Sequence, residues 1–354
     1  MNLTPWKKIR VLIVDDSTLA RRAIENALKL DSHLEVVGHA KDAYEARDKI
    51  LLLDPDVLTL DLEMPRMDGL SFLKILMAHH PIPVVVVSAL TPQGSPKAME
   101  ALSLGAVEVL GKPDVRLDFG EFAHQLAFSV KSVAQAGHKP HPAEISEAKS
   151  FQVPPPIPAG KYSSRRVILI GASTGGVEAL RFLLPRLPDG LPPILVVQHI
   201  PKEFSRLMAE RLDEVCAFQV REAKQGEELH PGLCLVAPGD FHLALAPFNS
   251  GYKVRITQSP PIHHCRPSVD VLFRSAAQHA GAHAVAALLT GMGTDGSLGL
   301  QALHSVRAKT LAEHEDSCVV YGMPRAAIEL GAADRVVPLA KMPNAILQAL
   351  AKAG

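Results

Sequence analysis

The chain has 354 residues, a length that suggests two domains, and 47% of them are hydrophobic, which is ample for packed cores. Its formal net charge is zero, so composition gives no sign of a nucleic-acid partner or a membrane-surface partner. The four cysteines show no metal-ligand spacing, and no apolar run reaches the length of a membrane span. We therefore expect a soluble cytoplasmic protein with no nucleic-acid partner and no direct membrane insertion.

Short apolar runs rich in β-branched residues alternate with helical patterns in the first part of the chain. The runs are 9–14 (IRVLIV), 57–60 (VLTL) and 84–87 (VVVV). Such continuous hydrophobicity is typical of strands that are covered on both faces. The pattern predicts a doubly wound parallel sheet, and so an α/β domain, over residues 1–135.

Polar residues stand at the carboxyl ends of these expected strands. They are Asp15, Asp16, Asp61, Ser88 and Lys112. Because the carboxyl ends of parallel strands meet at one edge of a sheet, we expect these side chains to converge. A single aspartate after a strand is more simply explained as a helix cap, but five suitable residues favour a functional pocket. Clustered carboxylates need a cation, and their oxygens suit Mg²⁺.

The motifs VDD, LDLEMPRMDGL, VVVSAL and GKP give residues 9–113 a strong resemblance to two-component receiver domains, which have a flavodoxin-like fold. The resemblance implies that Asp61 accepts a phosphoryl group and that Asp15 and Asp16 belong to an acidic pocket. It also implies that Asp16, Asp61 and the backbone carbonyl of Glu63 hold Mg²⁺.

The same resemblance assigns a switch. Ser88 would move toward the phosphoryl group, and Lys112 would pair with it. Val109 departs from the pattern, because receivers often carry an aromatic residue there. Valine has a short side chain with restricted χ1, so we do not expect an aromatic rotamer switch.

The periodic pattern disappears over 136–163 and returns after it. Residues 136–163 are rich in proline and polar residues, which predicts a semi-extended linker. Apolar runs at 167–170, 194–199 and 284–290 then predict a second doubly wound, mainly parallel domain over 164–354. Residues 233–256 instead predict strand, turn and strand, and so a β-hairpin.

The segment VILIGASTGGVEAL (167–180) predicts a strand, a tight turn and a helix. Its turn fits G-x-S-x-G, which exposes a serine, and fits neither G-x-G-x-x-G nor the ending of a P-loop. The turn alone leaves three functions open for this joint. The helix start could bind an anion, Ser173 could cap the helix, or Ser173 could be a nucleophile.

Two further residues stand where a serine nucleophile would need them. His199 ends the expected strand 194–199, and Asp295 follows the expected strand 284–290. A serine hydroxyl needs a histidine to take its proton and a carboxylate to hold the imidazole. The order Ser173, His199, Asp295 differs from that of an α/β-hydrolase. Taken singly, His199 is more simply structural and Asp295 a turn residue.

The motifs GASTGG, VVQHIP, VAPGDFHL, HHCRPSVDVLF and LLTGMGTDG resemble those of the chemotaxis protein-glutamate methylesterases, in the same order. Receiver, linker and this domain follow that family's architecture along nearly the whole chain. The resemblance implies that Ser173 is the nucleophile, His199 the base and Asp295 the orienting acid. It implies that the backbone N–H of Met292 helps to form the oxyanion hole, with Thr174 beside the nucleophile.

The resemblance also implies an activity and its partners. The expected reaction is phosphorylation-controlled hydrolysis of glutamate methyl esters, and deamidation of glutamines, on methyl-accepting chemoreceptors. A histidine kinase would donate the phosphoryl group, Mg²⁺ would serve the receiver alone, the esterase would need no cofactor, and the chain would be a monomer. Two alternatives stay open, a non-catalytic docking module and a methylesterase of a pathway that does not control motility.

One short stretch invites a metal interpretation. His263, His264 and Cys265 are adjacent, but adjacent side chains of an extended chain point to opposite faces, so a loop is the better prediction. Arg266 and Asp270 match a family motif, and we expect only a structural or substrate-positioning role for them.

Overall fold

The computed structural model describes residues 7–89, 94–112, 119–136, 155–158 and 160–352. Contacts divide the chain into two compact units, 1–139 and 140–354. Most of the predicted linker, 136–163, lies outside the described residues. Within the described ranges, we find no helix with the length and apolar character needed to cross a membrane.

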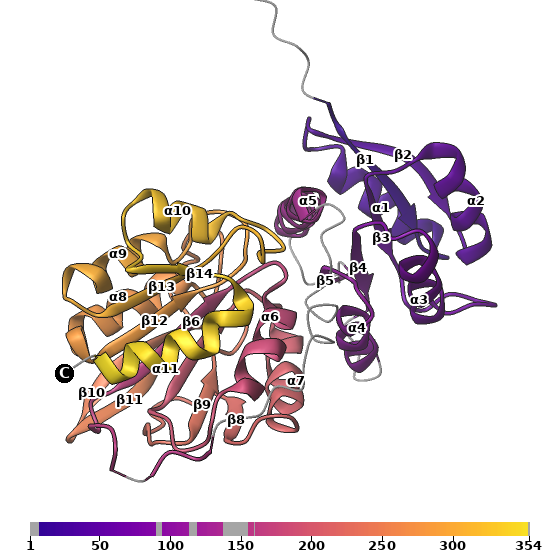
Figure 1. Cartoon of the computed structure of the whole chain (residues 1–354). Helices are drawn as coiled ribbons and strands as arrows, with labels where there is room; N and C mark the ends of the chain where they lie inside the picture. Colours follow the sequence, from indigo (N-terminus) through magenta and orange to yellow (C-terminus); the bar gives the residue numbers. More distant parts are fainter. Residues whose placement is uncertain (1–6, 90–93, 113–118, 137–154, 159, 353–354) are drawn as a thin grey trace, which may run out of the picture. The chain divides into compact units, whose positions relative to one another are not determined.

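Unit 1 alternates strands and helices around a five-stranded sheet in the order β2-β1-β3-β4-β5 (Figure 1). All of its strand pairs are parallel. The elements are β1 (Ile9–Val14), α1 (Thr18–Leu28), β2 (Leu34–Ala40), α2 (Ala43–Leu53), β3 (Val57–Leu60), α3 (Gly69–His79), β4 (Val84–Ser88), α4 (Gly94–Ser103), β5 (Glu108–Gly111) and α5 (Phe119–Ala136). This arrangement confirms the predicted doubly wound α/β class.

The edge strand β2 of unit 1 lacks the continuous hydrophobicity of the central strands β3 and β4. Every residue of β3 and β4 is buried, as expected for strands with helices on both faces. The edge strand β2 (LEVVGHA) is mostly half-buried and carries polar residues. For that reason its sequence gives a much weaker strand signal than 57–60 or 84–87.

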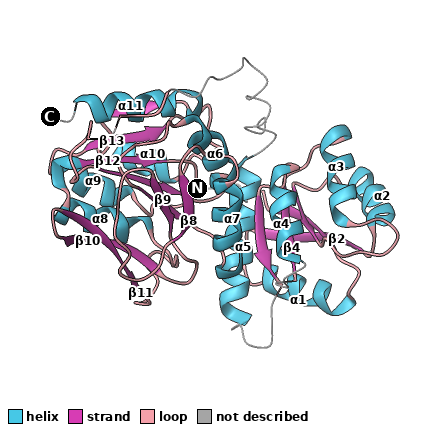
Figure 2. Ribbon diagram, turned by 90° about the horizontal axis from the view of Figure 1, so that it is seen from below, coloured by secondary structure: helices cyan, strands magenta, loops and turns pink. Residues whose placement is uncertain are grey.

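Unit 2 is built on a seven-stranded sheet in the order β14-β13-β12-β6-β7-β9-β8, with every pair parallel. Its strands are β6 (Val167–Ala172), β7 (Ile194–Gln198), β8 (Gln219–Glu222), β9 (Leu233–Val236), β10 (His242–Phe248), β11 (Gly251–Thr257), β12 (Ala284–Leu288), β13 (Lys309–Glu313) and β14 (Arg335–Val337). Its α-helices are α6 (Gly176–Leu183), α7 (Lys202–Asp213), α8 (Val269–His279), α9 (Ser297–Ser305), α10 (Met323–Glu329) and α11 (Met342–Lys352). Figure 2 shows these helices in cyan around the magenta sheet of the unit.

The predicted hairpin is present, but it begins later than the sequence pattern indicated. Residues 233–236 form β9, which joins the parallel sheet, while β10 and β11 form the antiparallel pair. The apolar run LCLV resembles a hairpin strand locally, and only its parallel pairing with β7 and β8 reveals its place in the sheet. The hairpin packs over α8, so apolar residues of both lie in one core with the main sheet.

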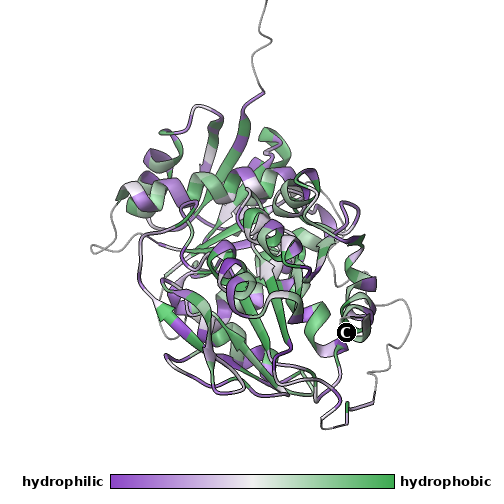
Figure 3. Ribbon diagram, turned by 90° about the vertical axis from the view of Figure 1, so that its left-hand side faces the viewer, coloured by the Kyte–Doolittle hydropathy of each residue, from purple (hydrophilic) through white to green (hydrophobic). Residues whose placement is uncertain are grey.

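The core of unit 2 explains why α8 is positioned so firmly. Phe273 of α8 is fully buried and belongs to the same hydrophobic cluster as Leu169 of the main sheet and Leu245 of the hairpin. In Figure 3 the central strands are coloured largely green, for hydrophobic residues. A helix held between two layers has a fixed amino terminus, and that terminus forms part of the site described below.

We predict that Gly69→Ala destabilises unit 1 by about 1–3 kcal/mol, the usual cost of forcing atoms into a packed site. A Cβ at Gly69 would lie 2.3 Å from the backbone oxygen of Asp61 and 2.6 Å from Cα of Leu62, and backbone atoms cannot move aside. Hydrogen exchange of peptides covering β3 and α3 measures the change. Lys74→Ala, at an exposed position of α3, is the control and should stay within about 0.5 kcal/mol. Equal protection in both variants would contradict this packing argument.

Candidate functional site

Unit 1 brings predicted pocket residues together at the carboxyl ends of adjacent strands. Asp15 follows β1 and Asp61 follows β3, and both carboxylates are buried. Lys112 follows β5, and its Nζ lies 2.8 Å from Oδ2 of Asp15 and 2.7 Å from Oδ2 of Asp61. Asp16 is exposed at the mouth, and the three aspartates offer oxygens within 4.8 Å of one another.

These aspartates are not helix N-caps. Ser17 caps α1 by accepting a hydrogen bond from the N–H of Ala20, and Asp68 caps α3 in the same way. The capping explanation, open from the sequence, therefore does not account for Asp15, Asp16 or Asp61.

The charges of this pocket are unbalanced. Burial raises the pKa of Asp61, and Lys112 opposes that rise while Asp15 adds to it. Burial also works to lower the pKa of Lys112, but its contacts with Asp15 and Asp61 outweigh burial and raise it. Three carboxylates face one ammonium, so the pocket has excess negative charge. An oxygen-rich, anionic donor set of this kind fits Mg²⁺.

Ser88 and Glu63 contact residues of this pocket through their backbone groups. Ser88, at the end of β4, is fully buried, and its hydroxyl has no hydrogen-bond partner among the described residues. The N–H of Lys112 donates to the carbonyl of Ser88. Glu63 is exposed, and its N–H donates to Oδ1 of Asp61 over 3.3 Å. Val109 is buried in β5, and its short side chain has no aromatic ring that could rotate outward.

In unit 2, Ser173, His199 and Asp295 lie together at the carboxyl ends of three neighbouring strands. Ser173 follows β6, His199 follows β7, and Asp295 lies in the loop after β12. The sheet order places β6 between β12 and β7, with the chain turning to opposite sides of β6. Such a reversal of strand order opens a crevice at the strand ends, where α/β proteins commonly bind ligands.

The turn after β6 presents the Ser173 hydroxyl to His199. The N-cap of α6 is Gly175, with no side-chain cap, so Ser173 does not cap this helix. Gly175 has φ of 77°, a left-handed conformation that favours glycine. A Cβ at Gly291 would lie 2.5 Å from Cβ of Ser173, so a side chain there would displace the serine. The turn is thus fixed from two sides by backbone geometry.

A continuous hydrogen-bonded chain joins the three side chains. Oγ of Ser173 lies 3.0 Å from Nδ1 of His199, and Nε2 of His199 lies 2.8 Å from Oδ2 of Asp295. With the carboxylate ionised, Nε2–H donates to Asp295, which leaves Nδ1 as the acceptor for the serine proton. The two ring nitrogens exchange the roles that they have in chymotrypsin-like proteases. Either arrangement leaves a neutral imidazole that can take a proton from the serine.

Asp295 is held by the amino terminus of α8. Its carboxylate accepts hydrogen bonds from the hydroxyl of Ser268 (2.8 Å) and from the N–H groups of Val269 (2.7 Å), Asp270 (3.1 Å) and Gly296 (3.0 Å). Burial works to raise the pKa of Asp295, but hydrogen bonds from His199 and these donors lower it to about 2. The positive end of a helix stabilises such an anion.

His199 has Cys265 as a second neighbour besides Asp295. Burial works to lower the pKa of His199, whereas Cys265 and Asp295 raise it, and the balance lies well above 6.5. Sγ of Cys265 is 3.5 Å from Nδ1 of His199, on the side that faces Ser173. A raised pKa means that His199 loses its proton, and becomes able to act as a base, only above its ordinary titration range.

Two further predicted residues lie beside the serine. Thr174 is buried, and its hydroxyl has no hydrogen-bond partner among the described residues. Met292 follows Gly291, the residue that packs against Cβ of Ser173. The assignment of its N–H to an oxyanion hole stays a prediction.

Sequence reasoning missed three residues that hold this site. Nε2 of Gln198 donates to the carbonyls of Ser173 and His199 at 2.8 and 2.9 Å. The buried His242 accepts from the N–H of Ser268 at Nδ1, and its Nε2 contacts the carbonyl of Pro260 at 3.1 Å. Burial lowers the pKa of His242, which favours the neutral ring that these contacts need. Gln198 and Ser268 are in the motifs VVQHIP and HHCRPSVDVLF, but only their contacts reveal their function.

The residues of the motif around Arg266 make contacts within unit 2. The Arg266 guanidinium pairs with Asp240, with Nε 2.8 Å from Oδ1. Asp270 donates its N–H to Asp295, and its own Oδ1 accepts from the N–H of Gly299 at 2.6 Å. His263 turns toward Asp270, whereas Cys265 contacts His199, so neighbouring residues of this loop serve different sites.

The sequence matches two protein families, one in each unit. Residues 11–118 match the response regulator receiver domain, and residues 168–346 match the CheB methylesterase family. The crystal structure of the Thermotoga maritima CheB methylesterase catalytic domain is 40% identical, with a TM-score of 0.51, and covers 52% of this chain and 97% of its own.

Full-length relatives share both parts. The protein-glutamate methylesterase/protein-glutamine glutaminase 2 of Syntrophus aciditrophicus is 44% identical over 96% of this chain and 99% of its own length. The protein-glutamate methylesterase/protein-glutamine glutaminase of Salmonella typhimurium is 45% identical over 96% of each. The expected resemblance is therefore confirmed, and the chain belongs to the family of CheB methylesterases that carry a response-regulator receiver domain.

Proposed function

We propose that this chain is a phosphorylation-activated hydrolase that removes methyl groups from glutamate methyl esters of methyl-accepting chemoreceptors. The observation that carries the proposal is the chain of contacts from Ser173 through His199 to Asp295, with 3.0 and 2.8 Å between the bonded atoms. The names of the full-length relatives support the same chemistry. The deamidation of glutamine side chains would use the same groups.

The first half-reaction forms an acyl-enzyme. Oγ of Ser173 attacks the γ-carbonyl carbon of the ester, and its proton passes to Nδ1 of His199. Asp295 stabilises the imidazolium that results, because its charge is held in place by α8. The N–H of Met292 would stabilise the oxyanion, and a donor of this kind is worth about 3 kcal/mol. Methanol leaves with the proton from His199.

The second half-reaction restores the enzyme. His199 takes a proton from a water molecule, and the resulting hydroxide attacks the acyl carbon. The proton then returns to Oγ of Ser173, and the glutamate carboxylate is released. With glutamine as substrate, ammonia leaves in place of methanol.

The receiver would control this reaction. Asp61 would accept a phosphoryl group from a histidine kinase, with Asp16, Asp61 and the carbonyl of Glu63 holding Mg²⁺. The metal ion, when bound, would neutralise charge on the phosphoryl oxygens. The buried hydroxyl of Ser88 has no partner among the described residues, which supports a part in this switch, because a phosphoryl oxygen would give it an acceptor. Lys112 would add the charge pairing.

Ser173→Ala should reduce methanol release from methylated chemoreceptor by about a millionfold, because without the Ser173 hydroxyl no acyl-enzyme can form. The assay compares radiolabelled methanol released with and without a small-molecule phosphodonor. The helix cap of α6 is Gly175, so the variant should stay folded.

Ser250→Ala, in the turn between β10 and β11, is the matched control and should keep full activity. A Ser173→Ala enzyme with more than a few per cent of normal activity would refute the nucleophile assignment. Failure of the unmodified chain to release methanol would instead favour the non-catalytic docking module.

Asp295→Asn should lower kcat by about ten-thousandfold, because the amide holds the imidazole in the wrong tautomer. The depressed pKa of Asp295 also has a consequence for stability. Its contribution, about 2 kcal/mol, is present above pH 4 and is lost as the pH falls toward about 2. Acid denaturation should therefore depend less steeply on pH in the variant. Asp316→Asn, at an exposed position, should change neither property.

Ser88→Ala should still be phosphorylated at Asp61 but should lose at least about tenfold in activation, the scale of one charge-assisted hydrogen bond. Mass spectrometry reports phosphorylation, and methanol release reports activation. Asp61→Ala should keep basal activity and lose the response entirely, because Asp61 belongs to the other unit.

Val109→Ala provides the comparison for Ser88→Ala. It removes two methyl groups from β5 and should alter activation only mildly. Full activation of the Ser88 variant, or collapse of activation in the Val109 variant, would contradict the assigned switch.

A further inference from the structure

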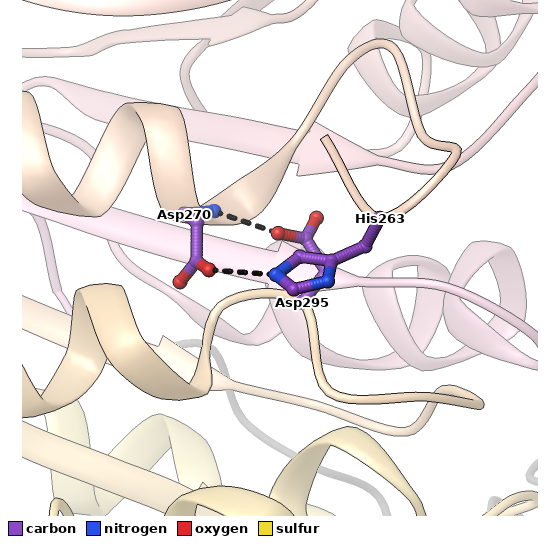
Figure 4. Close-up of side chains that lie close together, drawn as sticks. All are labelled: His263, Asp270 and Asp295. Atoms are coloured by element: carbon purple, nitrogen blue, oxygen red, sulfur yellow. Dashed lines mark hydrogen bonds and ion pairs between the residues drawn. The ribbon is translucent and has the colours of Figure 1, made fainter. Parts of the chain in front are cut away.

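A second cluster of ligand atoms lies next to the triad of Ser173, His199 and Asp295 and shares Asp295 with it. Figure 4 shows the imidazole of His263 next to the carboxylate of Asp270, with Asp295 beside both. Nε2 of His263 is 3.4 Å from Oδ2 of Asp270. One ligand atom from each of these three residues lies within 4.8 Å of the others.

Asp270 has a carboxylate oxygen to which no described residue donates a hydrogen bond. The residue is only 1% exposed. Its Oδ1 is fixed by the N–H of Gly299, whereas Oδ2 has no hydrogen-bond partner among the described residues. A buried carboxylate oxygen without a donor is costly, so this atom is oriented for a partner that the chain itself supplies only weakly. Nε2 of His263 lies 3.4 Å away, which is longer than a normal hydrogen bond.

The spacing of the two atoms matches a metal ion better than a hydrogen bond. Two ligands held 2.0–2.1 Å from a tetrahedral ion lie about 3.3–3.4 Å apart. Nε2 of His263 and Oδ2 of Asp270 already have that separation. A neutral imidazole and a carboxylate are typical ligands of Zn²⁺. We propose that His263 and Asp270 form a binding site for a divalent transition metal ion, specifically Zn²⁺.

Asp295 contributes charge to this site rather than a ligand. Its oxygens already accept hydrogen bonds from His199, Ser268 and the start of α8. Its carboxylate nevertheless lies within 4.8 Å of the other two ligand atoms, so it adds negative charge next to a cation. Water completes the coordination shell. The side chain of His263 is 41% exposed, which gives the ion a path from solvent.

Occupancy of the site inhibits the enzyme. A dication beside Asp295 competes electrostatically with the imidazolium that forms on His199 during catalysis. The triad then keeps its geometry and loses part of its stabilisation of that charge. This effect rests on the proposed esterase function, whereas metal binding itself does not.

The test measures Zn²⁺ binding to the full chain by equilibrium dialysis with Mg²⁺ in excess, for the unmodified protein and three variants. His263→Gln and Asp270→Asn should each lower the Zn²⁺ affinity of one site by about tenfold or more. Mutation of a residue that only hydrogen-bonds to a metal ligand can already weaken metal binding by that factor. His264→Gln alters the neighbouring histidine of the same loop and should bind normally. Asp270→Asn keeps a side-chain oxygen that can accept from the N–H of Gly299, so that variant should keep the fold.

Cobalt provides a readout that does not depend on activity. Co²⁺ added to the unmodified chain should give visible absorption of a tetrahedral complex, and His263→Gln should lose that absorption. Unchanged Zn²⁺ affinity in His263→Gln, or an equal loss in His264→Gln, would overturn the site.

Methanol release then tests inhibition separately. Zn²⁺ should inhibit the unmodified chain, and His263→Gln should resist it. Binding at His263 without any inhibition would overturn the inhibitory effect and leave the site standing. If the unmodified chain released no methanol at all, the proposed esterase function would fail while the dialysis and cobalt results still decided the site.

Discussion

The catalytic unit depends on one buried charge. Asp295 is 2% exposed, and its stability as an anion requires the hydroxyl of Ser268 and the first N–H groups of α8. Those donors are available only because α8 is packed between the main sheet and the hairpin. The charge in turn orients His199, and His199 orients toward Ser173. Loss of any of these contacts, including the packing of α8, would therefore disturb the contact between His199 and Ser173.

Both units use the same arrangement of strands to bring distant side chains together. Parallel strands end at one edge, where the chain order reverses, so residues far apart in sequence are brought together. In unit 1 the edge gathers carboxylates around Lys112, and their excess negative charge fits a cation. In unit 2 it gathers a hydroxyl, an imidazole and a carboxylate, which suit acyl transfer. The residue types at strand ends decide the chemistry, and the sheet decides their proximity.

Strand positions and strand-end residues were predictable from local pattern, because buried parallel strands are continuously apolar and the polar residues stand out after them. The predicted α/β class is confirmed in both units. The contacts of Gln198, His242 and Ser268 were not predictable, because they depend on how distant segments pack. The same limit applies to 233–236, a strand that pairs with β7 and β8 rather than with β10, the strand that follows it. Ring orientation of His199 also follows only from packing.

The most direct test of the account is covalent labelling of the full chain with a fluorophosphonate, followed by peptide mapping. Serine reacts with this reagent only when a neighbouring base takes its proton. We expect modification at Ser173, at a rate that rises with pH above 6.5 as His199 loses its proton, because the pKa of His199 is raised. No labelling of Ser173, or a labelling rate that does not respond to pH in this range, would contradict it.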